Sequence, residues 1–376
     1  RDGAIGFSTS QLDIHVAHDG REVPSNYATA TELVALAGAL REFDHGALEF
    51  IPRSCAEGMN AADRTLLCDM VRAAGGKPLE IQTLTPMPHQ PDAWLRTLDF
   101  CRDAQRQGLP IHPMFATNEL GAHFSLDSTF LFDEIPSFRE TLILPHAERL
   151  RRLRNPALRE RMRRELADPP GRAFMFVWFV MFVETVRDPA HQEHVGKHVQ
   201  ELADAAGQDP LDWFLDMNLA ENLETQFVLS MPREWDYRSM AADIVRDPIV
   251  MAGSSDGGAH LLSFTGADYT TRLLSEWVPN ILTLEQAVAR LTAAGARVHG
   301  LRDRGTLQPG AWADVTIYDP RRLRVGKTRL ARDFPGDSAR YVVDAEGYVA
   351  TIVNGQVLMD QGRHTGALPG HVLRGS

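Results

Sequence analysis

The feature of this sequence that most constrains its fold is a regular alternation of short apolar runs and amphipathic helical stretches. We predict strands at residues 4–7, 47–51, 79–84, 110–116 and 249–252, and helices at residues 31–43, 61–74 and 91–107. Successive strands between residues 47 and 116 start about thirty residues apart, which is the length of a strand–helix–strand unit. Repeated units of this kind favour an α/β barrel over a set of separate domains.

A long stretch of different character separates the fourth of these strands from the last. Residues 117–247 are predicted to be a mainly helical insertion, with helices at 145–167, 191–206 and 236–246. An insertion of this length on the loop side of a barrel is typical of a lid or a specificity element. The apolar run at residues 173–183 is eleven residues long, which is too short to cross a bilayer. A buried strand or helix explains this run, and a contact between subunits of a homo-oligomer is the alternative.

The C-terminal part of the chain changes to a period of two. Alternating apolar residues stand at 313–318, 348–353 and 356–359. Asn354-Gly355, between the last two runs, is a strong signal for a tight hairpin. A helix at residues 284–301, with Thr283 as its N-cap, precedes this region. The tail is therefore predicted to be a small all-β unit.

Charge and cysteine content argue against some classes of partner. The chain of 376 residues has 50 acidic and 39 basic side chains and a net charge of −11, which argues against nucleic-acid binding. The longest apolar run is too short for a membrane span, so no membrane partner is expected. The three cysteines are odd in number and lack metal-ligand spacing, which favours reduced thiols and a cytoplasmic location.

The stretch from Pro248 to His260 carries the main candidate for chemistry. Residues 249–252 are apolar without a break, as expected of a strand that is buried on both faces of a parallel sheet. Asp256 follows shortly after, before two glycines that let the backbone turn sharply. An acid at the carboxyl end of a barrel strand lies where barrel enzymes perform their chemistry. The alternative is an aspartate that only caps the next turn or helix.

Three segments carry motifs that are more specific than composition. They are Gly3-Ala-Ile-Gly-Phe-Ser-Thr-Ser10, Ser255-Asp-Gly-Gly-Ala-His260, and the Gly-x-Leu-x-Pro-Gly-x-x-Ala-Asp pattern that starts at Gly305 and is followed by Asp319. Together they resemble the amidohydrolase superfamily, and within it the D-aminoacylase (N-acyl-D-amino-acid deacylase) branch.

The resemblance implies an α/β fold, with a (β/α)8-type amidohydrolase barrel and a small β-sandwich domain. Residues 1–304 would form a partial barrel that lacks its N-terminal strands, with the insertion at residues 117–247. Residues 305–376 would form the C-terminal part of the sandwich.

The resemblance also implies zinc-dependent hydrolysis of a carbon–nitrogen amide bond, that of an N-acyl-D-amino acid. Asp256 matches the acid of the last barrel strand, which binds metal, takes a proton from water and delivers it to the leaving nitrogen. One or two zinc ions are implied, and the remaining ligands are expected in the N-terminal segment that this chain lacks.

Two strands depart from the family pattern, because neither offers the histidine that the resemblance leads us to expect. The strand at residues 47–51 carries Glu49, and carboxylates also bind zinc well. A buried strand acid paired with an arginine is an equally good interpretation of Glu49. The strand at residues 79–84 should offer another histidine, and Ile81-Gln82-Thr83 has none. A carboxylated lysine has no candidate either, since no lysine occurs before Lys77.

Substrate contacts are expected from loops over the carboxyl edge of the barrel. Ser8, Ser10 and His15 follow the first predicted strand, and His260 ends the catalytic stretch. An N-acyl amino acid carries a carboxylate, which serine and histidine would bind with single hydrogen bonds and Arg272 with two. The alternatives are turn-rich surface loops, a histidine bonded to backbone and, for Arg272, a solvated helix residue.

Several functions stay open from the sequence. The preferred hypothesis is a metal-dependent hydrolase that acts on a small-molecule substrate. The alternatives are a hydrolase of cyclic or other amides, a non-catalytic relative kept for binding or assembly, and a metal-free enzyme. The last would use Asp256 and His260 as an acid–base pair.

Overall fold

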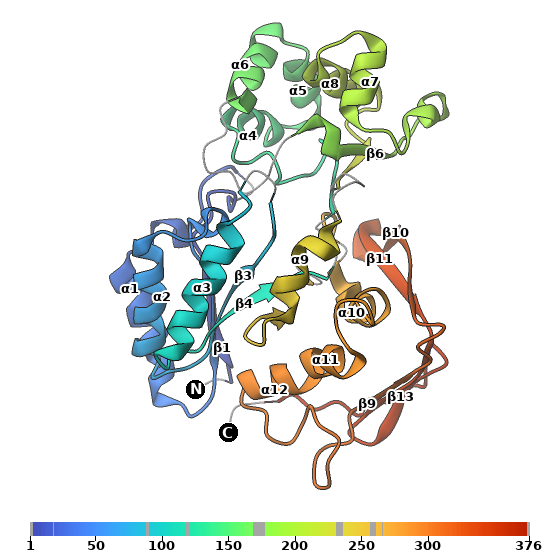
Figure 1. Ribbon diagram of the computed structural model, residues 1–376. Helices are drawn as coiled ribbons and strands as arrows, with labels where there is room; N and C mark the ends of the chain where they lie inside the picture. Colours follow the sequence, from blue (N-terminus) through green and yellow to red (C-terminus); the bar gives the residue numbers. More distant parts are fainter. Residues whose placement is uncertain are drawn as a thin grey trace.

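The computed structural model describes residues 3–17, 19–87, 90–117, 121–167, 177–230, 236–255, 261–264 and 266–373, and Figure 1 shows how its elements are arranged. Three parts can be distinguished. They are a parallel sheet with its helices, a lobe inserted after the fourth strand of that sheet, and a group of antiparallel strands towards the C-terminus.

A parallel sheet of five strands organises the first part. Its strands are β1 (Gly6–Ser10), β2 (Ala47–Ile51), β3 (Leu79–Thr83), β4 (Ile111–Phe115) and β8 (Met251–Ala252), in that order across the sheet. Between the first four run α1 (Ala30–Gly38), α2 (Ala61–Ala73) and α3 (Ala93–Arg106). The alternation predicted from the sequence is thus confirmed, and β2, β3 and β4 agree with their predicted bounds to within one residue.

The apolar residues of the strands explain why this arrangement forms. Leu48 and Phe50 of β2 flank Glu49, Leu79 and Ile81 of β3 flank Glu80, and all four apolar residues are at most 1% exposed. They pack in one cluster with residues of α1, α2 and α3, such as Met70. The helices therefore cover one face of the sheet and bury its apolar residues. The residues between them on each strand face the other side.

The lobe is built around a core of its own. Its elements are β5 (Ala122–Phe124), α4 (Pro136–Leu142), α5 (His146–Leu153), α6 (Pro156–Ala167), β6 (Met181–Thr185), α7 (Val199–Ala206), α8 (Pro210–Ala220) and β7 (Gln226–Leu229). The strands form an antiparallel sheet in the order β5-β7-β6. Rings of Phe124, Phe132, Phe214 and Phe227 pack against one another in the core. In Figure 1 the lobe stands at one end of the molecule, above the parallel sheet.

After the lobe the chain returns to the parallel sheet. The elements that follow are α9 (Tyr237–Arg246), β8, α10 (Tyr269–Glu276), α11 (Leu284–Ala289), a π-helical turn (Arg290–Ala294) and α12 (Gly295–Val298). Phe115, Tyr237 and Trp277 share a core cluster, so α9 and the end of α10 pack beside the end of β4. Thr283 caps α11 as predicted, and Gln286 completes a capping box with it.

The C-terminal strands form two antiparallel groups. They are β9 (Val315–Tyr318), β10 (Arg324–Phe334), β11 (Ser338–Glu346), β12 (Tyr348–Val353), β13 (Gln356–Asp360) and β14 (Arg363–His364). Strands β10 and β11 pair with each other, and the rest are ordered β14-β13-β12-β9. Asn354 and Gly355 have φ values of 49° and 79°, as the predicted tight hairpin requires, so the all-β tail is confirmed. Short 3₁₀ helices lie at Pro24–Tyr27, Ala39–Glu42, Cys55–Glu57, Trp178–Val180, Pro189–His194, Gly266–Asp268 and Pro335–Asp337.

Two predicted strands of the parallel sheet differ from the structure. Strand β1 starts and ends later than predicted, so Ser8 and Ser10 lie within the strand and not in the loop after it. The strand predicted at residues 249–252 forms only at Met251–Ala252. In both cases the backbone pairing with a neighbouring strand decides the bounds, whatever the apolar content of the segment.

The inserted region also differs in detail from its prediction. The helix predicted at residues 145–167 is two helices, because Asn155 starts a new one by accepting a hydrogen bond from the amide of Ala157 at 2.9 Å. The region contains a three-stranded sheet in addition to its helices. Among the described residues, no helix is both long and apolar enough to cross a membrane.

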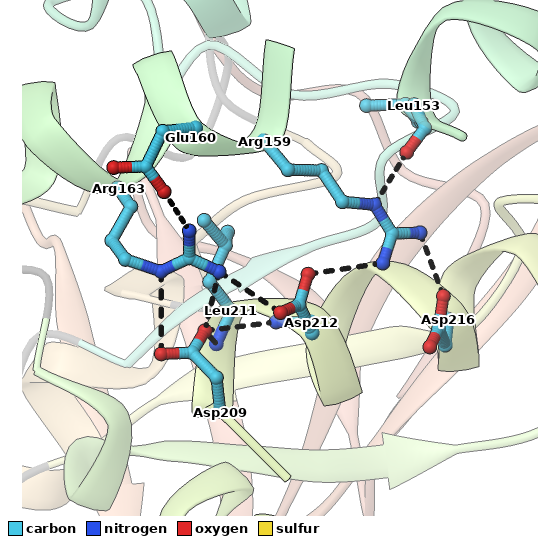
Figure 2. Close-up of polar contacts among 8 residues, drawn as sticks. All are labelled: Leu153, Arg159, Glu160, Arg163, Asp209, Leu211, Asp212 and Asp216. Atoms are coloured by element: carbon cyan, nitrogen blue, oxygen red, sulfur yellow. Dashed lines mark hydrogen bonds and ion pairs between the residues drawn. The ribbon is translucent and has the colours of Figure 1, made fainter. Parts of the chain in front are cut away.

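Charged residues join two helices of the lobe, as Figure 2 shows. Arg159 of α6 reaches Asp212 at 3.1 Å and Asp216 at 2.6 Å, both on α8. Its Nε donates to the carbonyl oxygen of Leu153, at the end of α5, at 2.8 Å. Arg163, one turn further along α6, binds the start of α8 in the same way. Only 14% of the Arg159 side chain is exposed, so these pairs are partly shielded from solvent.

We predict that Arg159→Ala loosens the contact between α6 and α8. The substitution removes the ion pair of Asp216, one of the two ion pairs of Asp212 and the donor to Leu153, so the lobe should lose about 2 kcal/mol of local stability. Arg151→Ala is the control and should have no effect, because Arg151 pairs with Glu148 at an exposed site within α5. Native-state hydrogen exchange of the α8 amides measures the difference, and equal exchange in the two variants would contradict the prediction.

Candidate active site

The carboxyl ends of the parallel strands meet at one edge of the sheet, where polar side chains gather. At the end of β1, Ser10 Oγ and His15 Nδ1 lie 2.7 Å apart, within hydrogen-bond distance. The loop that holds His15 is fastened by the buried Asn26, whose Nδ2 donates to the carbonyl oxygen of Leu12 at 2.8 Å. The fold therefore brings together Ser10 and His15, two of the residues predicted to contact substrate.

The sequence prediction missed a second contact at this edge. Thr83, the last residue of β3, forms a hydrogen bond through its hydroxyl with the hydroxyl of Ser254, just after β8. Ser254 has a φ of 63°, a left-handed conformation that costs non-glycine residues about 1–3 kcal/mol and clusters at functional sites. Gly266 packs so closely here that a Cβ would lie 2.7 Å from the carbonyl oxygen of Ser255. The two residues before Asp256 are thus held by β3 and by Gly266.

Two of the predicted site residues, Asp256 and His260, lie outside the residues that the structure describes. Their roles in proton transfer and substrate binding therefore stay predictions. In the chain, Asp256 directly follows Ser255.

Glu49 lies on the face of the sheet that points away from the helices. Ser8 is its register partner on β1, and Ser8 Oγ donates to Glu49 Oε2 at 2.8 Å. Glu49 is exposed, and no arginine in the described part of the chain forms an ion pair with it. A buried acid paired with an arginine is therefore not what the structure shows at this position. The carboxylate is available as an oxygen ligand.

The described residues do not make a complete metal site by themselves. Within residues 3–373, leaving aside the gaps named above, no three His, Cys, Asp or Glu side chains converge in a way that could hold a metal ion. Glu49 is a single oxygen donor of the kind that zinc accepts. It would need further ligands to complete a metal site.

The same face of the sheet carries a second acid, Glu80 of β3, in register with Glu49. His299 Nε2, just after α12, lies 3.1 Å from Glu80 Oε1. The hydrogen bond to Glu80 raises the pKa of His299, against the opposing effect of burial. His112 is in register with Glu80 on β4; burial lowers its pKa, and its Nδ1 lies 3.1 Å from the carbonyl oxygen of Ile249. These contacts assign His112 a structural role.

We predict that the Glu80–His299 pair stabilises the fold in a pH-dependent way. Because the pKa of folded His299 is raised, the stabilisation is fully present below its unfolded pKa of about 6.5 and is lost as the pH rises through the folded value. His299→Gln should therefore lower the unfolding temperature more at about pH 5.5 than at about pH 8.5. His371→Gln, in the exposed C-terminal tail, is the control. An equal effect of His299→Gln at both pH values would refute the prediction.

Arg272 is engaged within its own helix, α10. Its Nη2 lies 2.6 Å from Asp268 Oδ2, and its Nη1 lies 2.7 Å from Glu276 Oε1. The spacing of four residues on either side places all three side chains on one side of the helix. Carboxylates thus occupy both ends of the guanidinium, which favours a structural role over the predicted binding of a substrate carboxylate.

Sequence comparisons relate the chain to known proteins. A model of the amidohydrolase family matches residues 2–359. An N-acyl-D-glutamate deacylase of Alcaligenes xylosoxydans xylosoxydans is 57% identical over 51 residues, which cover 13% of this chain and 10% of that protein. An uncharacterized protein of Mycobacterium bovis is 33% identical over 138 residues, which cover 34% of this chain and 22% of that protein.

Solved structures share the fold of this chain. An N-acyl-D-glutamate deacylase from Bordetella bronchiseptica, complexed with zinc and a phosphonate inhibitor, has a TM-score of 0.56 at 23% identity. A D-aminoacylase studied for its binuclear metal center has a TM-score of 0.56 at 18% identity. Each match covers 99% of this chain and 63% of the solved one, so the chain spans less than two thirds of these relatives. The predicted fold class, an amidohydrolase-type α/β barrel with a small β-sandwich, is confirmed by this likeness.

Proposed function

The chain belongs to the amidohydrolase family, and on that premise we propose that the whole protein hydrolyses the amide bond of an N-acyl-D-amino acid in a metal-dependent reaction. The observation that carries the proposal is the 57% identity to an N-acyl-D-glutamate deacylase over 51 residues. The polar residues at the carboxyl edge of the sheet support it, since barrel enzymes bind their substrates at that edge. The substrate is then a small molecule with a free carboxylate.

Asp256 is the residue proposed to move the proton. A carboxylate directly after Ser255 can accept a proton from the attacking water and donate it to the leaving nitrogen. The acyl carbon gains the hydroxyl group of water and the carbon–nitrogen bond breaks. The nitrogen leaves as the amine of a D-amino acid, carrying the proton that Asp256 transferred.

Zinc is the proposed cofactor, as one or two ions. When bound, zinc polarises the amide carbonyl and lowers the pKa of water to about 7. Glu49 would contribute one oxygen ligand, and Ser8 would hold that carboxylate in a fixed orientation. Asp256 is the second proposed ligand. Because the described residues hold no complete site, further ligands must come from elsewhere in the protein.

Ser10, His15 and His260 are the proposed contacts of the substrate. The hydrogen bond between Ser10 and His15 fixes a polar pair at the carboxyl edge of β1, where each partner can bind a carboxylate oxygen through a single hydrogen bond. In this proposal Ser8 orients the carboxylate of Glu49 and does not contact the substrate itself. Arg272 is left out of it because two carboxylates already occupy its guanidinium.

The proposal also includes a cytoplasmic location and self-association of the protein. Three free cysteines, of which Cys101 is buried, fit the reducing conditions of a cytoplasm. Self-association through the apolar run at residues 173–183 is part of the same proposal. Phe179, which lies in that run, is 41% exposed and could contact a second subunit.

A panel of N-acetyl D- and L-amino acids and cyclic amides, assayed on the whole protein with zinc, tests this function. We expect amine release from the D substrates alone. We also expect a chelator to abolish turnover and added zinc to restore it. Turnover of cyclic amides only, or of L substrates equally well, would assign the protein to another branch of the family. A zinc-loaded protein that cleaves no amide would point to a non-catalytic relative.

We predict that Asp256→Asn abolishes turnover and leaves the fold intact. Asparagine keeps the shape of the side chain but cannot accept the proton from water. Asp360→Asn, on the C-terminal strand β13, is the control and should keep full activity. Steady-state kinetics and circular dichroism of both variants measure the outcome. A loss of less than about tenfold, or about 1.4 kcal/mol of barrier, would refute the role of Asp256.

A further inference from the structure

Three strands, two of the lobe and one near the C-terminus, meet at His123, Glu184 and Tyr341, which we call the junction cluster. His123 lies on β5 and Glu184 on β6 of the lobe, whereas Tyr341 lies on β11. His123 Nδ1 is 2.8 Å from Glu184 Oε2, and the hydroxyl of Tyr341 donates to the same oxygen at 3.0 Å. The rings of His123 and Tyr341 also pack, with centroids 4.3 Å apart. Figure 1 shows β6 on the side of the lobe nearest to β10 and β11.

The junction cluster is largely shielded from water. Only 8% of the His123 side chain and 24% of the Glu184 side chain are exposed. Burial, together with the nearby charge of Glu184, raises the pKa of Tyr341, so its hydroxyl keeps its proton and acts as a donor. Hydrogen bonds to a carboxylate are stronger than bonds between neutral groups, and a low local dielectric strengthens them further. The cluster therefore fixes β11 relative to the lobe.

The backbones of the same residues bind the chain beyond the Asp256 stretch. The amide of Tyr341 donates to the carbonyl oxygen of Leu261 at 2.8 Å. The amide of His123 donates to the carbonyl oxygen of Ser263 at 2.7 Å. Each of these two residues thus contributes its side chain to the junction cluster and its amide to this segment. A shift of either residue must move the segment as well.

Described residues therefore fasten the chain on both sides of Asp256. On the near side, Thr83 bonds Ser254, and Gly266 packs against the backbone that follows. On the far side, the amides of Tyr341 and His123 donate the two hydrogen bonds described above. The ring of Phe264 also lies 6.1 Å from the ring of Phe130 in the lobe. Five residues connect the two fastened ends.

We propose that the junction cluster positions Asp256 for proton transfer, an inference that rests on the catalytic role proposed for that residue. The three residues do not touch the substrate; they act through the backbone bonds at Leu261 and Ser263. A displacement of about 1 Å at a reacting group can lower a rate about a hundredfold. Of the proposed substrate contacts, Ser10 and His15 belong to a different strand end, whereas His260 directly precedes Leu261 in the chain. Substrate binding should therefore weaken, but by a smaller factor than the chemical step.

Two conservative substitutions and a matched control test the inference in the whole protein. Tyr341→Phe removes one donor and keeps the ring on His123, while Glu184→Gln removes the charge that both donors share. Tyr318→Phe makes the same chemical change on β9, outside the junction cluster. Two properties are measured for each variant: kcat and KM with an N-acetyl-D-amino acid, and hydrogen exchange of peptides that cover residues 253–264 and 338–346 without substrate.

We expect Tyr341→Phe and Glu184→Gln each to lower kcat at least about tenfold and to raise KM by a smaller factor, since two of the three proposed substrate contacts lie elsewhere. Exchange in both peptides should become at least about fivefold faster, and Tyr318→Phe should change neither property. The double variant should lose less than the product of the two single losses, because both act through one cluster. Unchanged exchange, or a kcat loss equal to that of Tyr318→Phe, would overturn the inference. A loss of kcat that is fully explained by a smaller fraction of folded protein would also overturn the inference.

The two proposals fail in different ways. If the parent protein cleaves no amide under any condition, the proposed function is wrong, and with it the catalytic part of this inference. The exchange measurement needs no activity, so it still decides whether the junction cluster holds the segment. If the parent is active and exchange does not respond, the function stands and the positioning role is wrong.

Discussion

The burial of alternate strand residues against α1, α2 and α3 is the constraint on which the rest of the structure depends. Side chains of a strand point alternately to its two faces, so burying Leu48 and Phe50 forces Glu49 onto the opposite face. A register slip of one residue would exchange the two sets, which makes that slip costly. The parallel register then sets Ser8 beside Glu49 and Glu49 beside Glu80. The polar face of the sheet is thus a consequence of its apolar one.

The sequence predicts a strand well where apolar residues mark the segment, as in β2. It predicts a strand poorly where pairing with a neighbouring strand decides the bounds, as in β1. The sequence predicts strand β2 to the residue, because it is a short and mostly apolar segment. Strand β1 includes Ser8 and Ser10, which have no apolar character. They are strand residues because each pairs with β2 across the sheet, up to Ser10 opposite Ile51. Such pairing is a tertiary effect that overrides local preference, and the sequence pattern carries no signal of it.

The candidate site divides in the same way between local and distant contacts. Ser10 and His15 stand five positions apart, so their proximity could be expected. The ion pairs of Arg272 could also be predicted from the sequence, since acids stand four positions before and after it on one helix. Thr83 and Ser254 are 171 positions apart, and no spacing rule connects them. The junction cluster joins three strands that are far apart in the sequence, so no sequence motif predicts it.

Two of the contacts that attach the lobe to the rest of the chain differ in kind. Where the chain enters the lobe, the hydroxyl of Tyr237 donates to the carbonyl oxygen of Ala116 at 3.0 Å, and Trp277 Nε1 donates to that of Thr117 at 2.9 Å. These buried aromatic residues fix where the chain leaves β4. The junction cluster attaches the lobe to β11, and each added point of attachment lowers the rotational freedom of the lobe. Because the junction cluster also binds Leu261 and Ser263, the orientation of the lobe and the placement of these two residues depend on the same few hydrogen bonds.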